Sequence, residues 1–240
     1  LSVYTKAEVH AGTLLKDGGK YVQEYSKGIK KGPVKKVGPS KLNGTILTFK
    51  PDSEIFPEIT FDFARVVNHL RQQAYLVKGL RISVIDARES KEKIEDGKVF
   101  YIRELGLDAP SMTFYFEGGL LSLVKFYNSI QKPIHKNIFY IEKKSNEYES
   151  VEVSLQYVDD ISSRIVPFAN NIYNSEGGTH VTGFKTALTR TLNAYARKNN
   201  LVKESEDNFT GDDVLEGLTA VISVKIREIQ FEGQTKAKLG

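Results

Sequence analysis

Apolar positions repeat with the period of an α-helix in two long segments of the chain. Between residues 61 and 78 they are spaced three or four residues apart, which places them on one helical face. Gly79 follows and is expected to end this helix, because glycine readily adopts the left-handed conformation of a C-terminal cap. A second helix is predicted for residues 180–198. Its inward residues are expected to be Val181, Phe184, Leu188, Leu192 and Tyr195, and its outward residues Thr186, Arg190, Asn193 and Arg197.

Runs of β-branched and aromatic residues predict strands in both halves of the chain. The predicted strands are residues 45–49, 80–85, 99–103, 112–116, 137–142, 151–157, 164–169 and 220–226, with short helices near 120–127 and 212–218. In the segment 151–157, valine, leucine and tyrosine alternate with Glu152, Ser154 and Gln156, which predicts a strand with one buried face. The fold class is therefore α+β, and a new unit is expected to start near Gly118-Gly119.

Composition limits the class of protein without naming a function. The chain is 40% hydrophobic and 27% charged, as in globular proteins, and its 240 residues can form two domains. Basic residues exceed acidic ones by only 34 to 30, so charge alone is a weak argument for nucleic acid. There is no cysteine for disulfides or thiolate chemistry, and no apolar run long enough to span a membrane. Met112 is the only methionine, so we expect Leu1 to be a processing or truncation point in a larger protein.

The usual sequence motifs of catalysis are not found in this chain. It contains no phosphate-binding loop, dinucleotide fingerprint, paired-histidine zinc spacing or nucleophile elbow. Its four histidines are scattered, and no metal ligands are predicted. The catalytic motifs searched for in the sequence therefore identify no reaction.

Two glycine-containing segments could carry chemistry. Gly177 and Gly178 permit a tight turn into the second long helix, with Thr179 as the predicted N-cap. Residues 231–240 place an amide, a hydroxyl and an ammonium group on one loop, and these are donors suited to phosphate oxygens. Taken alone, the first segment also fits a purely structural turn and the second a solvated tail.

A series of short motifs in fixed order decides between these interpretations. From Asn170 to Lys236 the chain reads Asn-Asn-Ile, Glu-Gly-Gly-Thr-His, Gly-Phe, Ala-Leu-Thr-Arg, Gly-Asp-Asp-Val, Glu-Gly-Leu, Ala-Val-Ile-Ser-Val-Lys and Phe-Glu-Gly-Gln-Thr-Lys. This series resembles the transducer domain of the ATPase subunit of bacterial type IIA DNA topoisomerases, the gyrase B and topoisomerase IV B family. Upstream, Gly44-Thr45, Pro51-Asp52, Ile55-Phe56 and Phe116-Glu117-Gly118-Gly119 resemble the last part of the ATP-binding domain in the same subunit.

The resemblance implies a fold and an activity. Residues 1–118 would be the C-terminal part of a GHKL ATPase α/β sandwich, and residues 119–240 a ribosomal-S5-like transducer domain whose C-terminal end is missing. The parent protein would use ATP and Mg²⁺ to drive DNA strand passage, in supercoiling or in decatenation. In this family the general-base glutamate and the magnesium-binding asparagine lie before the position of Leu1. This chain alone is therefore expected to hold no catalytic or metal residue and to be inactive.

The resemblance also assigns four site residues. Thr45 matches a threonine beneath the adenine of ATP, and Gln234 and Lys236 match a glutamine and a lysine that reach the terminal phosphate. Lys185 matches a position that lines a DNA cavity, where the family more often has arginine; lysine keeps the charge but loses the planar fork.

The implied partners are a second B subunit in an ATP-gated dimer, an A subunit carrying the DNA-cleaving tyrosine, and double-stranded DNA. The expected location is the cytoplasm, in association with the nucleoid and not with a membrane. A non-enzymatic nucleic-acid-binding or scaffold domain with an S5-like fold is the alternative, favoured if the upstream coding sequence lacked the glutamate and asparagine motifs. A mismatch-repair ATPase of the same superfamily is a third hypothesis, for which a different sequence around 234–236 is expected.

Overall fold

The chain forms two compact units. The computed structural model describes residues 2–5, 9–10, 13–14, 18–40, 44–92, 105–145 and 149–240. One unit comprises Leu1–Val66 with Ser83–Met112, and the other comprises Val67–Ile82 with Thr113–Gly240. Most of the first long helix belongs to the C-terminal unit, because Tyr75 and Leu76 pack into the same core cluster as Leu120 and Phe168. The domain boundary predicted near residue 118 stays a prediction.

The N-terminal unit is built on a four-stranded sheet in the order β7-β4-β1-β8. Its strands are β1 (Ser2–Thr5), β4 (Gly19–Val22), β7 (Lys35–Pro39) and β8 (Gly44–Ile46). Two short hairpins join β2 (Val9–His10) to β3 (Thr13–Leu14) and β5 (Tyr25–Ser26) to β6 (Ile29–Lys30). The strand predicted for residues 45–49 is shorter than expected. It ends at Ile46, opposite Ser2 at the start of β1, and Leu47 and Phe49 are exposed.

The first long helix and the strand after it occur close to where the sequence predicts them. Helix α1 spans Phe63–Leu76, and Gly79 has a φ of 74°, the left-handed conformation expected of a residue that ends a helix. Strands β9 (Arg81–Ile85) and β10 (Ser111–Tyr115) form a two-stranded sheet. The strand predicted for residues 99–103 lies outside the described residues.

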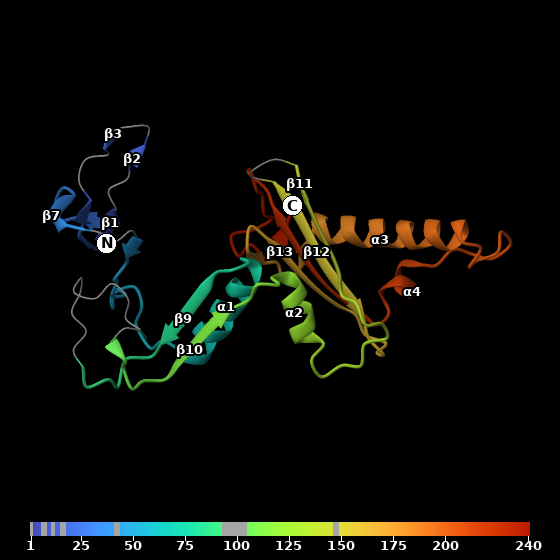
Figure 1. The fold of residues 1–240 in the computed structure, drawn as a ribbon, viewed down its shortest axis with the longest axis horizontal. Helices are drawn as coiled ribbons and strands as arrows, with labels where there is room; N and C mark the ends of the chain where they lie inside the picture. Colours follow the sequence, from blue (N-terminus) through green and yellow to red (C-terminus); the bar gives the residue numbers. More distant parts are fainter. Residues whose placement is uncertain are drawn as a thin grey trace. The chain divides into compact units, whose positions relative to one another are not determined.

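The C-terminal unit contains a five-stranded sheet in the order β11-β12-β16-β13-β14. Its strands are β11 (Phe139–Lys144), β12 (Ser150–Tyr157), β13 (Arg164–Ala169), β14 (Ile172–Tyr173) and β16 (Leu218–Lys225). Strands β13 and β16 are parallel, and the other neighbours are antiparallel. Between these two parallel strands the chain passes through α3 (Thr179–Lys198) and α4 (Gly211–Leu215), as Figure 1 shows.

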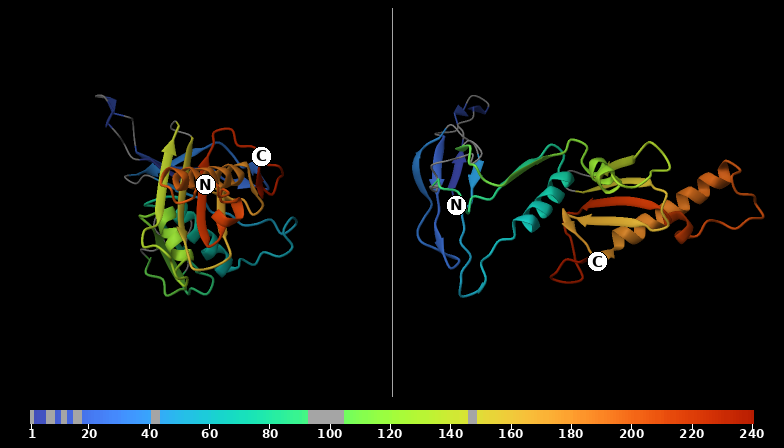
Figure 2. Two further views of the ribbon diagram at one scale, coloured as in Figure 1. Left: turned by 90° about the vertical axis from the view of Figure 1, so that its right-hand side faces the viewer. Right: turned by 90° about the horizontal axis from the view of Figure 1, so that it is seen from below.

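Helices cover both faces of this sheet. Helix α2 (Leu120–Tyr127) packs on one face with Phe168 and Val221, and α3 packs on the other, where Val181, Phe184 and Leu188 contact a cluster that includes Ile222 (Figure 2). The central strand β16 is buried on both faces, as its nearly continuous apolar run predicts. None of the helices in the described ranges is long and apolar enough to cross a membrane.

The side of β12 that carries its polar residues is buried as well as its apolar side. Ser154 and Gln156 are buried, because α2 and the loop after it cover their side of the sheet. Their polar atoms are satisfied inside the protein: Asn128 Nδ2 donates to Gln156 Oε1 (3.0 Å), and the Thr219 hydroxyl donates to Asn128 Oδ1 (2.8 Å). A buried polar network therefore satisfies the polar side chains of this strand in place of water.

The face assignment of α3 is correct only in its first half. Figure 1 shows the C-terminal half extending beyond the strands toward α4, so residues there cannot pack on the sheet. Tyr195, predicted to face inward, is 60% exposed. Asn193, predicted to face outward, instead binds the backbone of Phe209 in both directions, with Nδ2 donating to the carbonyl (2.9 Å) and Oδ1 accepting from the N–H (2.8 Å).

Candidate functional site

The loop of residues 231–237 is held against the start of α3. Strand β17 (Lys238–Leu239) pairs in parallel with β15 (Gly177–Gly178), and the N–H of Glu176 donates to the carbonyl of Ala237 at 2.9 Å. Phe231 forms an isolated antiparallel bridge with Leu239, which brings the two ends of the loop together. The two glycine-containing segments singled out in the sequence therefore form one structural feature.

Gly178 permits this contact because it has no side chain. A Cβ atom at this position would lie 2.3 Å from the carbonyl oxygen of Leu239, and the φ of 137° is one that residues with side chains rarely adopt. The prediction that Thr179 caps α3 is wrong. The N-cap is Gly178 and makes no side-chain cap, and the Thr179 hydroxyl instead donates to the carbonyl of Gly240 at 2.8 Å.

Gln234 and Lys236 are exposed residues of this loop. Lys236 has a left-handed backbone, with a φ of 57°, and its N–H donates to the carbonyl of Gly233 at 3.0 Å. Its carbonyl accepts a hydrogen bond from Asn174 Nδ2 at 2.8 Å. The Lys236 ammonium lies 6.0 Å from the centre of the Phe231 ring, the outer limit of a cation–π contact.

The charges around the loop differ between Lys236, which lies in it, and Lys238, which follows it in β17. Lys238 forms an ion pair with Glu232 at 2.9 Å, and the hydrogen bond to this carboxylate raises the pKa of Lys238. Among the described residues, no carboxylate lies within ion-pair distance of the Lys236 ammonium. Burial lowers the pKa of His180, next to this junction, and favours its neutral form. The loop can therefore present one unpaired positive charge and a neutral amide to an anion.

Thr45, also predicted as a binding residue, belongs to the other compact unit. It is exposed on β8 and lies opposite Val3 of β1 in the antiparallel register. The candidate residues thus come from both units, with Gln234 and Lys236 on one loop and Thr45 on a strand.

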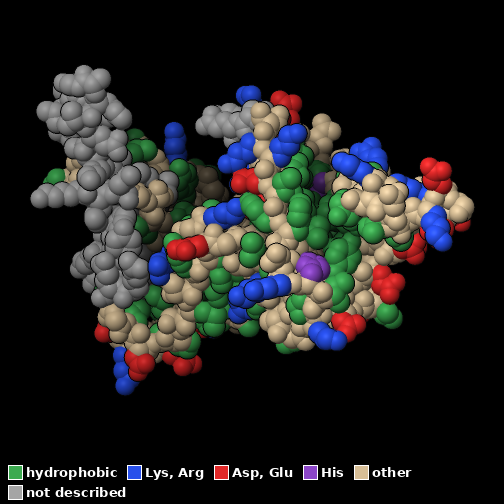
Figure 3. Space-filling model, turned by 45° about the vertical axis from the view of Figure 1, so that its right-hand side comes forward, with side chains coloured by type: hydrophobic (Ala, Val, Ile, Leu, Met, Phe, Trp, Pro, Cys, Tyr) green, Lys and Arg blue, Asp and Glu red, His purple; other side chains and the backbone are tan. Residues whose placement is uncertain are grey.

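Lys185 and Arg190 are exposed on α3, but Arg197 is not part of the same surface. Its guanidinium donates to the carbonyls of Lys203 and Glu206 and to Asn208 Oδ1, so it holds the loop that follows α3. The basic residues exposed on this side of α3 are therefore Lys185 and Arg190, without Arg197. On the part of the C-terminal unit that Figure 3 shows, Lys and Arg side chains are scattered among neutral and acidic ones.

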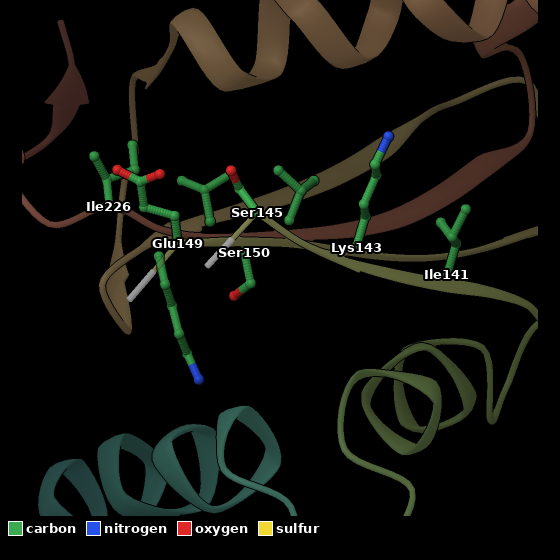
Figure 4. Close-up of a pocket in the computed structure, with 9 residues that line it drawn as sticks. Ile141, Lys143, Ser145, Glu149, Ser150 and Ile226 are labelled. Carbon is green, nitrogen blue, oxygen red and sulfur yellow. The ribbon is translucent and has the colours of Figure 1, made fainter. Parts of the chain in front are cut away.

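An apolar groove that sequence reasoning missed lies at one end of the five-stranded sheet, where β11 and β16 end and β12 begins. It has a volume of about 620 Å³, and β11, β12 and β16 supply most of its lining. Ile141 and Lys143 project from the strands on the side of α3, and Ser150 projects to the other side (Figure 4). No sequence motif marks this groove, because its lining residues come from the neighbouring strands β11 and β12 and from β16, which is distant from them in the chain.

Comparison with known proteins places these features in a family. The family model described as DNA gyrase B matches residues 119–240, just over half of the chain. The chain belongs to the DNA gyrase B family. The DNA gyrase B protein of Halalkalibacterium halodurans is 43% identical over 242 residues, which include 100% of this chain and 34% of that protein. The chain thus spans about a third of the length of this curated relative.

Solved structures of gyrase B and topoisomerase IV resemble nearly the whole chain. The ATPase domain of Thermus thermophilus gyrase B, solved with an aminocoumarin, has a TM-score of 0.73 and 34% identity, covering 92% of this chain and 55% of that one. The topoisomerase IV ATP-binding domain of Francisella tularensis, solved with a small-molecule inhibitor, has a TM-score of 0.71 and 26% identity, covering 99% and 57%. The α+β fold predicted from the sequence is confirmed, and so is the family resemblance.

Proposed function

We propose that this chain is part of the ATP-hydrolysing B subunit of a bacterial type IIA DNA topoisomerase, which couples ATP binding and hydrolysis to DNA strand passage. Membership of the DNA gyrase B family supports the proposal. Residues 1–118 would be the C-terminal part of the ATP-binding domain and residues 119–240 the transducer. The partners would be a second B subunit, an A subunit carrying the DNA-cleaving tyrosine and double-stranded DNA, in the cytoplasm and associated with the nucleoid.

The loop of residues 231–237 carries the mechanistic part of the proposal. Its backbone is anchored at the start of α3, Gln234 and Lys236 are exposed, and no acidic residue in the described ranges pairs with Lys236. In the working enzyme, the Lys236 ammonium would pair with the γ-phosphate of ATP and stabilise the charge that spreads over its oxygens in the transition state. Gln234 would donate a weaker, neutral hydrogen bond to the same phosphate.

Thr45 and Lys185 would act away from this chemistry. We propose that the Thr45 hydroxyl joins the polar network around the adenine and that Lys185 contacts DNA phosphates from the exposed side of α3. Magnesium would accompany the nucleotide. The described residues contain no group of three His, Asp or Glu side chains that could hold a metal, so we propose no ligand for the ion in this chain.

Replacement of Lys236 in the full-length subunit tests this function. Lys236→Ala should slow ATP turnover by roughly a hundredfold, since a lost charge-assisted contact in a closed site costs about 3 kcal/mol in the transition state. The affinity for a non-hydrolysable ATP analogue should stay within a few-fold of wild type, because most contacts to the nucleotide would come from elsewhere. Gln234→Ala should act in the same direction with a smaller effect.

Lys238→Ala is the matched control, because this nearby lysine is already paired with Glu232. Its turnover should stay close to that of the wild type. Turnover by Lys236→Ala within a few-fold of wild type would refute the role of the loop. A parallel collapse of analogue affinity would instead mean that Lys236 contributes to ground-state binding.

A further inference from the structure

Asn174 is fully buried beneath the loop that carries Lys236. Its backbone N–H donates to the carbonyl of Pro167 in β13 at 3.0 Å, and its carbonyl accepts from the N–H of Gly177 at 2.9 Å. These bonds attach Asn174 to the five-stranded sheet on one side and to the turn before α3 on the other. Its side-chain Nδ2 then donates to the carbonyl of Lys236 at 2.8 Å.

The backbone of Lys236 needs such support because its φ of 57° is unfavourable for a residue with a Cβ atom. Its N–H is bound within the loop by Gly233, and its carbonyl is bound by Asn174. Within the described parts of the chain, Asn174 supplies the one side chain that hydrogen-bonds the Lys236 backbone. The two bonds together determine the direction in which the lysine side chain leaves the loop.

The second polar atom of the Asn174 side chain, Oδ1, indicates that Asn174 is buried for the sake of the bond from Nδ2 to the Lys236 carbonyl. Oδ1 is buried and finds no hydrogen-bond partner among the residues that the structure describes, which is costly for an amide inside a protein. An apolar side chain of similar size would fill the same space without that cost. The Nδ2 bond to Lys236 is the contact that offsets it.

We propose that Asn174 is a positioning residue for Lys236: it holds the lysine backbone in the left-handed conformation from which the ammonium can reach a terminal phosphate. This inference rests on the proposed function of Lys236. Asn174 would not touch the nucleotide itself. Its loss should therefore reduce the fraction of molecules in which Lys236 is correctly placed and leave the ammonium intact.

The test is a double-mutant cycle in the full-length subunit. Asn174→Asp removes the donor with little change in shape, and Asn174→Ala removes it without adding a charge, in case the carboxylate prevents folding. Each is combined with wild-type Lys236 and with Lys236→Ala. With Lys236 present, ATP turnover should fall about tenfold, and the KM for ATP should change less than about twofold. In the Lys236→Ala background, the same substitution should cause no further loss.

Asn170→Asp is the matched control. Asn170 makes the same kind of bonds to the backbone of Ile226, with Nδ2 donating to the carbonyl and Oδ1 accepting from the N–H, both at 2.9 Å. Its replacement should lower thermal stability by a comparable amount. Any change in turnover caused by Asn170→Asp should be the same in the background that retains Lys236 and in the Lys236→Ala background.

The outcomes separate the two proposals. In one outcome, Lys236→Ala slows turnover, but the Asn174 variants either do not slow turnover or slow it equally in both backgrounds. Asn174 is then a structural residue, and its positioning role is overturned while the function of Lys236 stands. If Lys236→Ala itself leaves turnover unchanged, the proposed function fails and the positioning role fails with it. Loss confined to the background that retains Lys236 supports both.

Discussion

Single residues decide the conformation of the junction between α3 and the loop of residues 231–237. Gly178 lets the backbone of Leu239 approach so closely that a Cβ atom would meet its carbonyl oxygen at 2.3 Å. Lys236 adopts a left-handed backbone although it has a Cβ atom, and its bonds to Gly233 and Asn174 hold it there. Even substitutions that change no charge and no polar group should therefore alter the backbone conformation of this junction.

Gly178→Ala should destabilise the protein by roughly 2–4 kcal/mol, because it combines an overlap with backbone atoms and an unfavourable φ. Gly183→Ala is the control: a Cβ atom there meets nothing within 4 Å, and alanine is the better helix former inside α3. The control should be neutral or stabilising by about 0.5–1 kcal/mol. Denaturant unfolding measures both. Equal stability of the two variants would contradict the close contact at Gly178.

At the scale of elements, α3 and α4 are joined through the loop between them. Arg197 binds two carbonyls and an amide oxygen of this loop, and Asn193 binds Phe209. Helix α4 then starts with a capping box: the Thr210 hydroxyl accepts from the N–H of Asp213 at 3.2 Å, and Asp213 Oδ2 accepts from the N–H of Thr210 at 2.7 Å. The polar side of α3 therefore orders the chain that follows it.

The Asp213 carboxylate of this capping box should make the free energy of unfolding depend on pH. Hydrogen bonds from the side chain and backbone of Thr210 lower the pKa of Asp213 below its ordinary value of 3.8. A carboxyl with a lowered folded pKa stabilises the protein above its unfolded pKa, and this contribution is lost as pH falls through the folded pKa.

Asp213→Asn should therefore be less stable than wild type at about pH 6, and the difference should shrink as the pH falls below 3.8 and through the lowered pKa of the Asp213 carboxyl. Asp212→Asn, which removes a neighbouring carboxylate outside the capping box, serves as the control in the same unfolding experiments. A constant difference between wild type and Asp213→Asn across this pH range would contradict the assignment.

At the scale of the whole molecule, the charge is nearly balanced, with 34 basic and 30 acidic residues. The proposed DNA contact therefore rests on a few exposed residues of α3 and not on a strongly basic surface. Lys185 and Arg190 are exposed there, whereas Arg197 is occupied by the loop of residues 203–208.

Binding of this chain to duplex DNA should be weak, independent of sequence and sensitive to salt. Lys185→Ala and Arg190→Ala should each reduce the slope of log affinity against log salt by about one or less, since each would remove at most one phosphate contact. Arg197→Ala should leave this slope unchanged. Fluorescence anisotropy across a salt series measures all three. A sequence-specific complex that persists at high salt would contradict this account, and so would a slope that depends on Arg197.

The sequence alone determined the longer elements of the C-terminal unit and the family. Helices α1, α2 and α3 and strands β12, β13 and β16 occur close to their predicted positions, because hydrophobic periodicity and helix-ending glycines act over a few neighbouring residues. The order of short motifs from Asn170 to Lys236 identified the family, since such a series depends on residue identity and not on packing.

Only the tertiary structure decided which faces are buried and which residues meet. The polar residues of β12 are buried because α2 covers them, and Tyr195 is exposed because α3 extends beyond the sheet. The bond from Asn174 to Lys236 joins residues 62 positions apart. Local periodicity carries no information about such a contact, because it depends on how the strands and helices pack together, and for this reason the support beneath the proposed phosphate-sensing lysine could not be predicted from the sequence.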